Sequence, residues 1–168
     1  MNQKEINNLV SFGKIVNTHG VKGEVKVTIY PSNFENDLAK SNLFFIKDED
    51  LIKKQIISSI KRHKNIYLVK IQGVNNINQI EKYKNFEIYI DKESILKNNY
   101  LYHELIGMKV IFNNDLIGIV ENYYIQGNFY SLSIVDNEEL SIPINDRFIK
   151  NVNKINREIT VDFPEGYL

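Results

Sequence analysis

The chain has no cysteine among its 168 residues. This absence excludes disulfide bonds, thiolate nucleophiles, cysteine-ligated zinc sites and iron–sulfur clusters. No stretch approaches the roughly 18 consecutive apolar residues that a membrane span requires. The first eight residues, MNQKEINN, also lack the basic-then-apolar order of a signal peptide. We therefore expect a soluble, cytoplasmic protein.

Motifs for catalysis and for metal binding are missing as well. The histidines His19, His63 and His103 are too far apart in the sequence to form an H-x-x-x-H or H-E-x-x-H zinc motif. The segment 20–23 (GVKG) has the spacing of neither a P-loop nor a dinucleotide-binding loop. No serine lies in a G-x-S-x-G nucleophile motif. We therefore expect no catalytic residue, no metal and no cofactor.

The formal net charge is zero, from 21 basic and 21 acidic side chains, but the two signs are unevenly distributed. Residues 1–91 carry 14 basic and 10 acidic side chains, whereas residues 92–168 carry 7 basic and 11 acidic ones. The first part could therefore approach phosphate groups, and the second could attract a basic protein. Chance variation of the surface is an alternative that charge alone leaves open.

The first part of the chain has strand character. Residues 23–30 (GEVKVTIY) alternate strictly between apolar and polar side chains, which is the period of a half-buried strand. A short helix capped by Asn75 or Asn76 is expected over 75–83. Strands this short and this regularly spaced are typical of a closed barrel. The other expected strands are Leu9–Val16, Leu43–Lys47, Gln55–Lys61, Ile66–Gln72 and Phe86–Ile90.

The second part repeats this pattern after a short ordered connector that could hold one helical turn. We expect an N-terminal domain over 1–91, a linker over 92–101 and a C-terminal domain over 102–168. Turn residues separate short strands in the C-terminal domain, which again suggests a small barrel. A helical turn is expected over 147–152, and Pro143 should end a strand or lie at a sheet edge. The expected strands are Met108–Phe112, Leu116–Tyr124, Phe129–Val135, Glu139–Ile144 and Glu158–Phe163.

Two segments stand out as candidate sites. In the first, Gly20 and Gly23 permit positive φ in a tight turn, which places His19 at a loop tip beside Lys22 and near Lys26. These three side chains could contact RNA phosphate or a protein. A barrel-closing turn with no binding role is the alternative.

The second segment, 100–110 (YLYHELIGMKV), begins with two tyrosines that precede the C-terminal domain. Tyrosine is favoured at protein interfaces. Because Tyr102 follows Tyr100 by two positions, the two rings would share a face in an extended chain. Both rings could therefore contact a protein partner. The alternative is that one or both rings cover the core. In Tyr123-Tyr124, alternation places one ring toward the core and one at the surface.

Five motifs in register resemble the RimM family of ribosome maturation factors, and together they span nearly the whole chain. They are the G-x-I-x-x-x-H-G-x-x-G-E-V-x-V run of Gly13–Val27, the short helix of Asn75–Tyr83, the aromatic entry of Tyr100–Gly107, the strand end Ile142-Pro143, and the terminus Pro164–Leu168 (PEGYL).

This resemblance implies a mostly β fold with two small barrels in tandem and short helices. The N-terminal barrel would be translation-factor-like and the C-terminal barrel of the PRC type. The resemblance also implies a non-enzymatic, monomeric assembly factor for the immature small ribosomal subunit, which assists maturation of the head and ribosomal RNA processing. The implied partner is the nineteenth small-subunit ribosomal protein, contacted through the tyrosine pair and the second barrel, with ribosomal RNA as a secondary contact.

The chain departs from the family pattern in the aromatic entry. Leu101 aligns with the second tyrosine of the family pair, Tyr102 aligns with a tryptophan, and Glu104 replaces an aspartate. These departures do not say which ring faces the partner, and because Tyr100 and Tyr102 share a face in an extended chain we expect both to contact it, with His103 as a neighbour. Two other classes of protein also stay open. One is a flavin-linked small-barrel enzyme with His19 and Lys22 on the phosphate, and the other is an RNA-binding barrel that acts alone.

Overall fold

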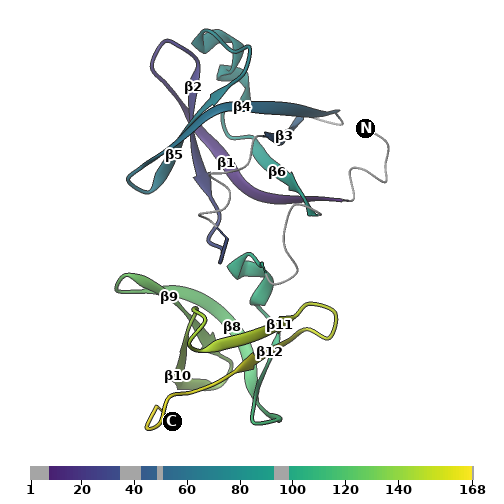
Figure 1. Cartoon of the computed structure of the whole chain (residues 1–168), viewed down its shortest axis with the longest axis vertical. Coiled ribbons are helices and arrows are strands. Elements are labelled where there is room, and N and C mark those ends of the chain that lie inside the picture. Colours follow the sequence, from purple (N-terminus) through teal and green to yellow (C-terminus); the bar gives the residue numbers. More distant parts are fainter. Residues whose placement is uncertain (1–7, 35–42, 49–50, 93–98, 168) are drawn as a thin grey trace. The chain divides into compact units, whose positions relative to one another are not determined.

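A computed structural model describes residues 8–34, 43–48, 51–92 and 99–167 of the chain. The chain divides into two compact units (Figure 1). Unit 1 comprises Met1–Tyr30 and Phe34–Lys97, and unit 2 comprises Pro31–Asn33 and Asn98–Leu168. Both units are built almost entirely from strands, which confirms the expected fold class. None of the described helices is long and apolar enough to cross a membrane.

Unit 1 is a closed barrel in which every neighbouring pair of strands is antiparallel. The strands follow one another around the barrel in the order β1-β2-β5-β4-β3-β6. All six were predicted, although β1 and β4 run further than expected. Their bounds are β1 (Leu9–His19), β2 (Glu24–Ile29), β3 (Leu43–Asp48), β4 (Leu51–His63), β5 (Ile66–Ile71) and β6 (Glu87–Asp91).

Alternation explains the interior of this barrel. On β2, Val25 and Val27 are buried while Glu24 and Lys26 are half-buried, as the period of two requires. The neighbouring strand β5, which pairs with β2, repeats the pattern with Tyr67, Val69 and Ile71 buried, at 4%, 2% and 1% exposure. The buried apolar rows of the strands thus meet inside the barrel, while the alternate rows, polar on β2 and mixed on β5, lie outside.

The short helix expected over 75–83 is instead two consecutive 3-10 helices, η1 (Ile77–Gln79) and η2 (Glu81–Tyr83). Asn76 caps the first one, because its Oδ1 accepts a hydrogen bond from Gln79 N at 3.3 Å while Gln79 Oε1 accepts from Asn76 N at 3.3 Å. A segment this short lacks the length that stabilises an α-helix, so its tighter 3-10 turns are set by the cap and by burial of Ile80.

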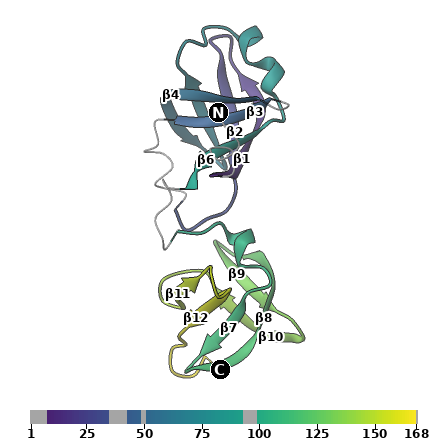
Figure 2. The same ribbon diagram turned by 90° about the vertical axis from the view of Figure 1, so that its right-hand side faces the viewer.

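Unit 2 is a six-stranded sheet with the order β10-β9-β8-β7-β12-β11 (Figure 2). β12 runs parallel to β7, and the other neighbouring pairs are antiparallel. β10 is an edge strand and ends at Pro143, as expected from the proline. The elements are η4 (Tyr102–Leu105), β7 (Lys109–Phe112), β8 (Asp115–Gln126), β9 (Phe129–Ile134), β10 (Asn137–Pro143), β11 (Ile149–Asn153) and β12 (Glu158–Val161).

The helical turn expected over 147–152 is wrong, because this segment leads into a sixth strand. β11 pairs with β12 from Ile149 opposite Val161 to Asn153 opposite Glu158. Ile149 and Val161 are both buried, so the hairpin covers the core with side chains whose local spacing also suited a helix. The last strand also ends earlier than expected, at Val161. The helical turn expected in the connector falls largely on 93–98, outside the described residues.

Three residues from the first half of the chain belong to unit 2. Ser32 forms an antiparallel bridge with Leu101. Asn33 N donates to Tyr100 O at 3.2 Å, and Tyr102 N donates to the carbonyl of Pro31 at 2.8 Å. The segment 31–33 therefore pairs with the backbone of residues 100–102, where η4 begins. A division of the chain by sequence position alone does not anticipate this pairing.

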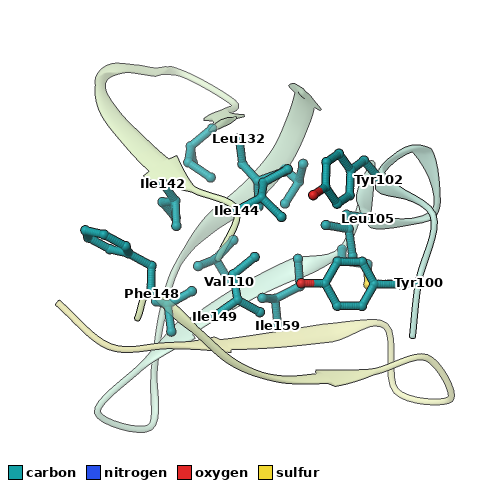
Figure 3. Packing of buried hydrophobic residues seen from close by; sticks show 14 residues of the cluster. Tyr100, Tyr102, Leu105, Val110, Leu132, Ile142, Ile144, Phe148, Ile149 and Ile159 are labelled. Atoms are coloured by element: carbon teal, nitrogen blue, oxygen red, sulfur yellow. The ribbon is translucent and has the colours of Figure 1, made fainter. Parts of the chain in front are cut away.

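The core of unit 2 gathers apolar side chains from η4 and all six strands or the loops between them. Figure 3 shows Tyr100 and Tyr102 near Leu105 at one end of this cluster and Phe148 at the other end. The fully buried members include Leu105, Val110 and Leu132. The cluster consists of Tyr100, Tyr102, Leu105, Met108, Val110, Val120, Leu132, Ile134, Ile142, Ile144, Phe148, Ile149, Ile159 and Val161.

Candidate functional site

The structure places both tyrosines of the aromatic entry inside the core of unit 2. Tyr100 is 5% exposed and Tyr102 is 9% exposed. Their ring centroids lie 6.2 Å apart at an interplanar angle of 42°. Burial raises the pKa of the Tyr100 phenol well above its ordinary value. The two rings therefore lie together, as their spacing suggested, but they present little surface to a partner.

Polar contacts hold the backbone around these rings. Glu104 Oε2 accepts a hydrogen bond from Leu101 N at 2.7 Å and forms an ion pair with Lys154 Nζ at 3.0 Å. Arg157 Nη2 donates to the carbonyl of Ile106 at 2.8 Å. Glu104 thus connects the start of η4 to the β11–β12 turn. His103, the third expected partner residue, is exposed on η4.

The β8–β9 hairpin continues the aromatic cluster toward the surface. Tyr102 makes edge-to-face contacts with Tyr123 and Tyr130, with centroids 6.1 and 5.2 Å away. Both hairpin rings are half-buried, and Tyr124 is 40% exposed, which confirms the expected division of the Tyr123-Tyr124 pair. Tyr102 is therefore a packing support for the hairpin.

Two large apolar side chains are exposed near the end of this hairpin. Ile125 is 66% exposed and lies opposite Tyr130, whereas Phe129 is 48% exposed and lies opposite Gln126. Since neighbouring residues of a strand face opposite sides, the hairpin presents apolar surface on both faces. Sequence reasoning missed these residues, although apolar side chains within two positions of the Gly127-Asn128 turn were the signal available.

An open cavity of about 400 Å³ lies beside the edge strand β10. Asn137, Glu139, Leu140, Ser141 and Tyr167 line it. Tyr124 Oη and Ser141 Oγ share a hydrogen bond of 2.6 Å, and Tyr167 Oη donates to the carbonyl of Ser141.

Burial, with a smaller contribution from Tyr124, raises the pKa of Tyr167. The hydroxyls at the cavity beside β10 thus have partners within the chain, Tyr124 with the Ser141 hydroxyl and Tyr167 with the Ser141 carbonyl. The lining includes neither His19 nor Lys22, so it gives no support to a flavin site that uses them.

The glycine turn of unit 1 has the positive φ angles that its sequence suggested, +59° at Gly20 and +75° at Gly23. A Cβ on Gly23 would come within 2.7 Å of Val74 Cγ1 and 2.9 Å of the carbonyl oxygen of Asn76, whereas a Cβ on Gly20 would meet nothing within 4 Å. The ammonium of Lys70 donates to the carbonyls of Lys22 and Val74. The turn is therefore packed against the segment that leads to η1.

The three basic candidates of unit 1 are placed around this turn. His19 is the last residue of β1 and is half-buried opposite Glu24. Lys22 is exposed in the turn itself. Lys26 lies on β2 opposite Asn17. Across the part of the chain that the structure describes, no group of three or more His, Cys, Asp or Glu residues is arranged to hold a metal ion.

Comparison with known proteins assigns a family to each half of the chain. Residues 10–95 match the model of the RimM N-terminal domain, and residues 97–168 match that of the PRC-barrel domain. A Pseudomonas aeruginosa protein described as a 16S ribosomal RNA processing protein, RimM, has a similar fold. Its TM-score is 0.50 at 22% identity, over 95% of this chain and 99% of that one.

Relatives match over nearly their full length. The ribosome maturation factor RimM of Leuconostoc citreum is 32% identical over 96% of this chain and 97% of its own. The protein of the same name from Oceanobacillus iheyensis is 31% identical over 94% and 96%. The arrangement of a closed barrel followed by a PRC-barrel domain agrees with these matches, and the chain belongs to the RimM family of ribosome maturation factors.

Proposed function

We propose that the chain is a ribosome maturation factor that binds the immature small ribosomal subunit and assists its assembly and ribosomal RNA processing. The observation that carries this proposal is the match of both domains, in order, to relatives of that name over nearly the whole chain. Such a factor acts by binding and release, as a monomer in the cytoplasm, and needs no covalent step.

The protein partner that we propose is the nineteenth small-subunit ribosomal protein, bound by unit 2. Residues 92–168 carry 11 acidic and 7 basic side chains, which suits a basic partner. The contact region that we propose consists of His103 on η4 together with the end of the β8–β9 hairpin, which the partner would contact on both faces, at Ile125 on one and at Phe129 on the other. In this proposal Tyr100 and Tyr102 support the surface from within the core. Tyr102 packs against Tyr123 and Tyr130 of the hairpin.

Apolar side chains give this surface its binding free energy. Exposed apolar patches with a polar surround are typical of protein interfaces, where a few aromatic and aliphatic side chains carry most of the energy. Ribosomal RNA is the secondary contact in this proposal, through His19, Lys22 and Lys26 of unit 1. Those side chains surround the packed glycine turn, so their backbone positions are well defined.

Titration of the purified protein against free small subunits and against whole ribosomes tests the proposal. The variant Ile125→Ser/Phe129→Ser removes the exposed apolar contacts without touching the core. We expect binding to free subunits in preference to whole ribosomes, weakened about tenfold or more in this variant. The matched control is Ile155→Ser, because Ile155 is 94% exposed in the β11–β12 turn of the same unit.

The two parts of the proposal fail separately. Absence of binding to either particle would contradict the assignment as a small-subunit maturation factor. Binding that is weakened equally by the hairpin variant and by Ile155→Ser, or by neither, would contradict the proposed surface while leaving the assignment in place.

A further inference from the structure

Lysines that are distant in sequence lie in one row on the outer face of the unit 1 barrel. β2, β5 and β4 are neighbouring strands (Figure 1). Lys26 of β2 lies opposite Leu68 of β5, and Leu68 lies opposite Lys61 of β4. Residues directly opposite one another in antiparallel strands point to the same side. Val25 and Val69, one position away, fill the interior, so this row faces outward.

More basic groups surround this row. Lys70 lies two residues beyond Leu68, opposite Glu24 on one side and Ser59 on the other. Its ammonium bonds the carbonyls of Lys22 and Val74, so its charge is held at that edge of the face.

We consider the outward positions of β2, of β5 and of the half of β4 that pairs with β5. Glu24 is the one acidic side chain among these described positions. We call the positions Glu24, Lys26, Thr28, Ser59, Lys61, His63, Ile66, Leu68 and Lys70 the lysine face.

The chemistry of the lysine face favours phosphate groups over bases. Single-stranded RNA is usually held by large aromatic rings on which bases stack, and none of the nine positions is a phenylalanine, tyrosine or tryptophan. Lysine is a flexible point charge that contacts phosphate without reading sequence. Lys26 and Lys61 are two strand spacings apart, roughly 9–10 Å between backbones, so both ammonium groups can reach one nucleic-acid backbone. A broad sheet surface with these properties suits a duplex.

A membrane surface fits the lysine face less well. Peripheral binding to lipid requires apolar side chains that enter the headgroup region, in addition to basic charge. The apolar residues of this face, Ile66 and Leu68, are half-buried against their neighbours. The face therefore offers charge without an insertable apolar group.

We propose that the lysine face binds the phosphate backbone of double-stranded RNA, with Lys26 and Lys61 as its principal contacts. The inference rests on the proposed function only for identifying that RNA as ribosomal. It extends the candidate contact of His19, Lys22 and Lys26 to Lys61 and Lys70, which no sequence motif connected with them.

The test measures binding of the full-length protein to a 20-base-pair RNA duplex of arbitrary sequence at several salt concentrations. Each phosphate contact contributes about 0.9 to the slope of log affinity against log salt. The variant Lys26→Gln/Lys61→Gln should therefore lower this slope by about 2 and weaken binding about 60-fold near 0.1 M salt. Lys47→Gln/Lys109→Gln, two exposed lysines outside the face with the same change in charge, should leave both quantities nearly unchanged.

Other results overturn the inference. These are an unchanged slope in Lys26→Gln/Lys61→Gln, an equal loss in the control variant, or no duplex binding by the parent protein. Binding to vesicles with one-third anionic phospholipid that equals duplex binding, and is lost in the same variant, would assign the face to a membrane instead. Titration with free small subunits is run in parallel, because subunit binding without duplex binding contradicts this inference while leaving the proposed function intact.

Discussion

Replacing Tyr102 by alanine should destabilise unit 2, because this ring is a structural part of its core. The ring is 9% exposed and makes edge-to-face contacts with Tyr123 and Tyr130. Deleting a buried aromatic side chain costs about 3–5 kcal/mol. The two aromatic pairs account for roughly 1–3 kcal/mol of that loss.

This loss is comparable with the whole stability expected of a domain of this size, roughly 4–11 kcal/mol. Tyr102→Ala should therefore populate an open form of unit 2 to a measurable extent. Tyr102→Phe keeps the ring and its packing, so it should lie within about 1.5 kcal/mol of the parent protein. A double Tyr100→Ala/Tyr102→Ala variant would lose partner binding through unfolding, even if neither ring touches the partner.

Hydrogen exchange followed by mass spectrometry measures this effect within one molecule. Peptides from 108–161 report unit 2, and peptides from 12–29 report unit 1 as an internal reference. We expect faster exchange in the first set alone for Tyr102→Ala and little change for Tyr102→Phe. A loss below about 1 kcal/mol for Tyr102→Ala would refute the reasoning, because a ring so placed in a core cannot be removed at so small a cost.

Two further predictions concern a turn and a titrating group. Gly23→Ala should destabilise unit 1 by about 2–4 kcal/mol, since alanine at φ +75° is strained and its Cβ would meet Val74 and Asn76. Gly20→Ala, with open space around it, should cost only about 1 kcal/mol, and calorimetry that finds the two equal would contradict the packing described. The raised pKa of Tyr100 means that the folded state keeps a proton that the unfolded state loses above pH 10. Stability should thus be unaffected by this group below about pH 10 and then fall by up to about 1.4 kcal/mol per pH unit. Urea unfolding at pH 8 and pH 11 should show a smaller alkaline loss for Tyr100→Phe, and an equal loss would be evidence against its burial.

Local patterns were sufficient for most of the strands. The alternation of Val25 and Val27 with Glu24 and Lys26 placed β2 to within one residue at each end. Such patterns depend only on the alternation of side chains between the two faces of a strand. This alternation is a local property that can be read from consecutive residues. The error at 147–152 has a related origin. Ile149 and Val152 are three residues apart, which suits a helical turn, and only the register shift between Ile149 and Asn151 lets this spacing fit β11.

The candidate sites were less accessible to sequence reasoning. Tyr100 and Tyr102 were expected together, and they are together, but their burial depends on η4 being folded onto β8 and β9. Ile125 and Phe129 were missed because their exposure depends on where the hairpin leaves the core. Burial is a property of packing between elements, and no local pattern reports it directly.

By itself the sequence determined the β class, most strands, the turn glycines, the opposite charge of the two halves and the family. Each of these features follows from the composition, from the alternation of apolar and polar residues or from short motifs. Only the tertiary structure decided that residues 31–33 pair with the entry to η4, that the tyrosine pair is buried, and that Lys26 and Lys61 share a face. These features depend on strand order and register, which follow from contacts between residues far apart in the chain.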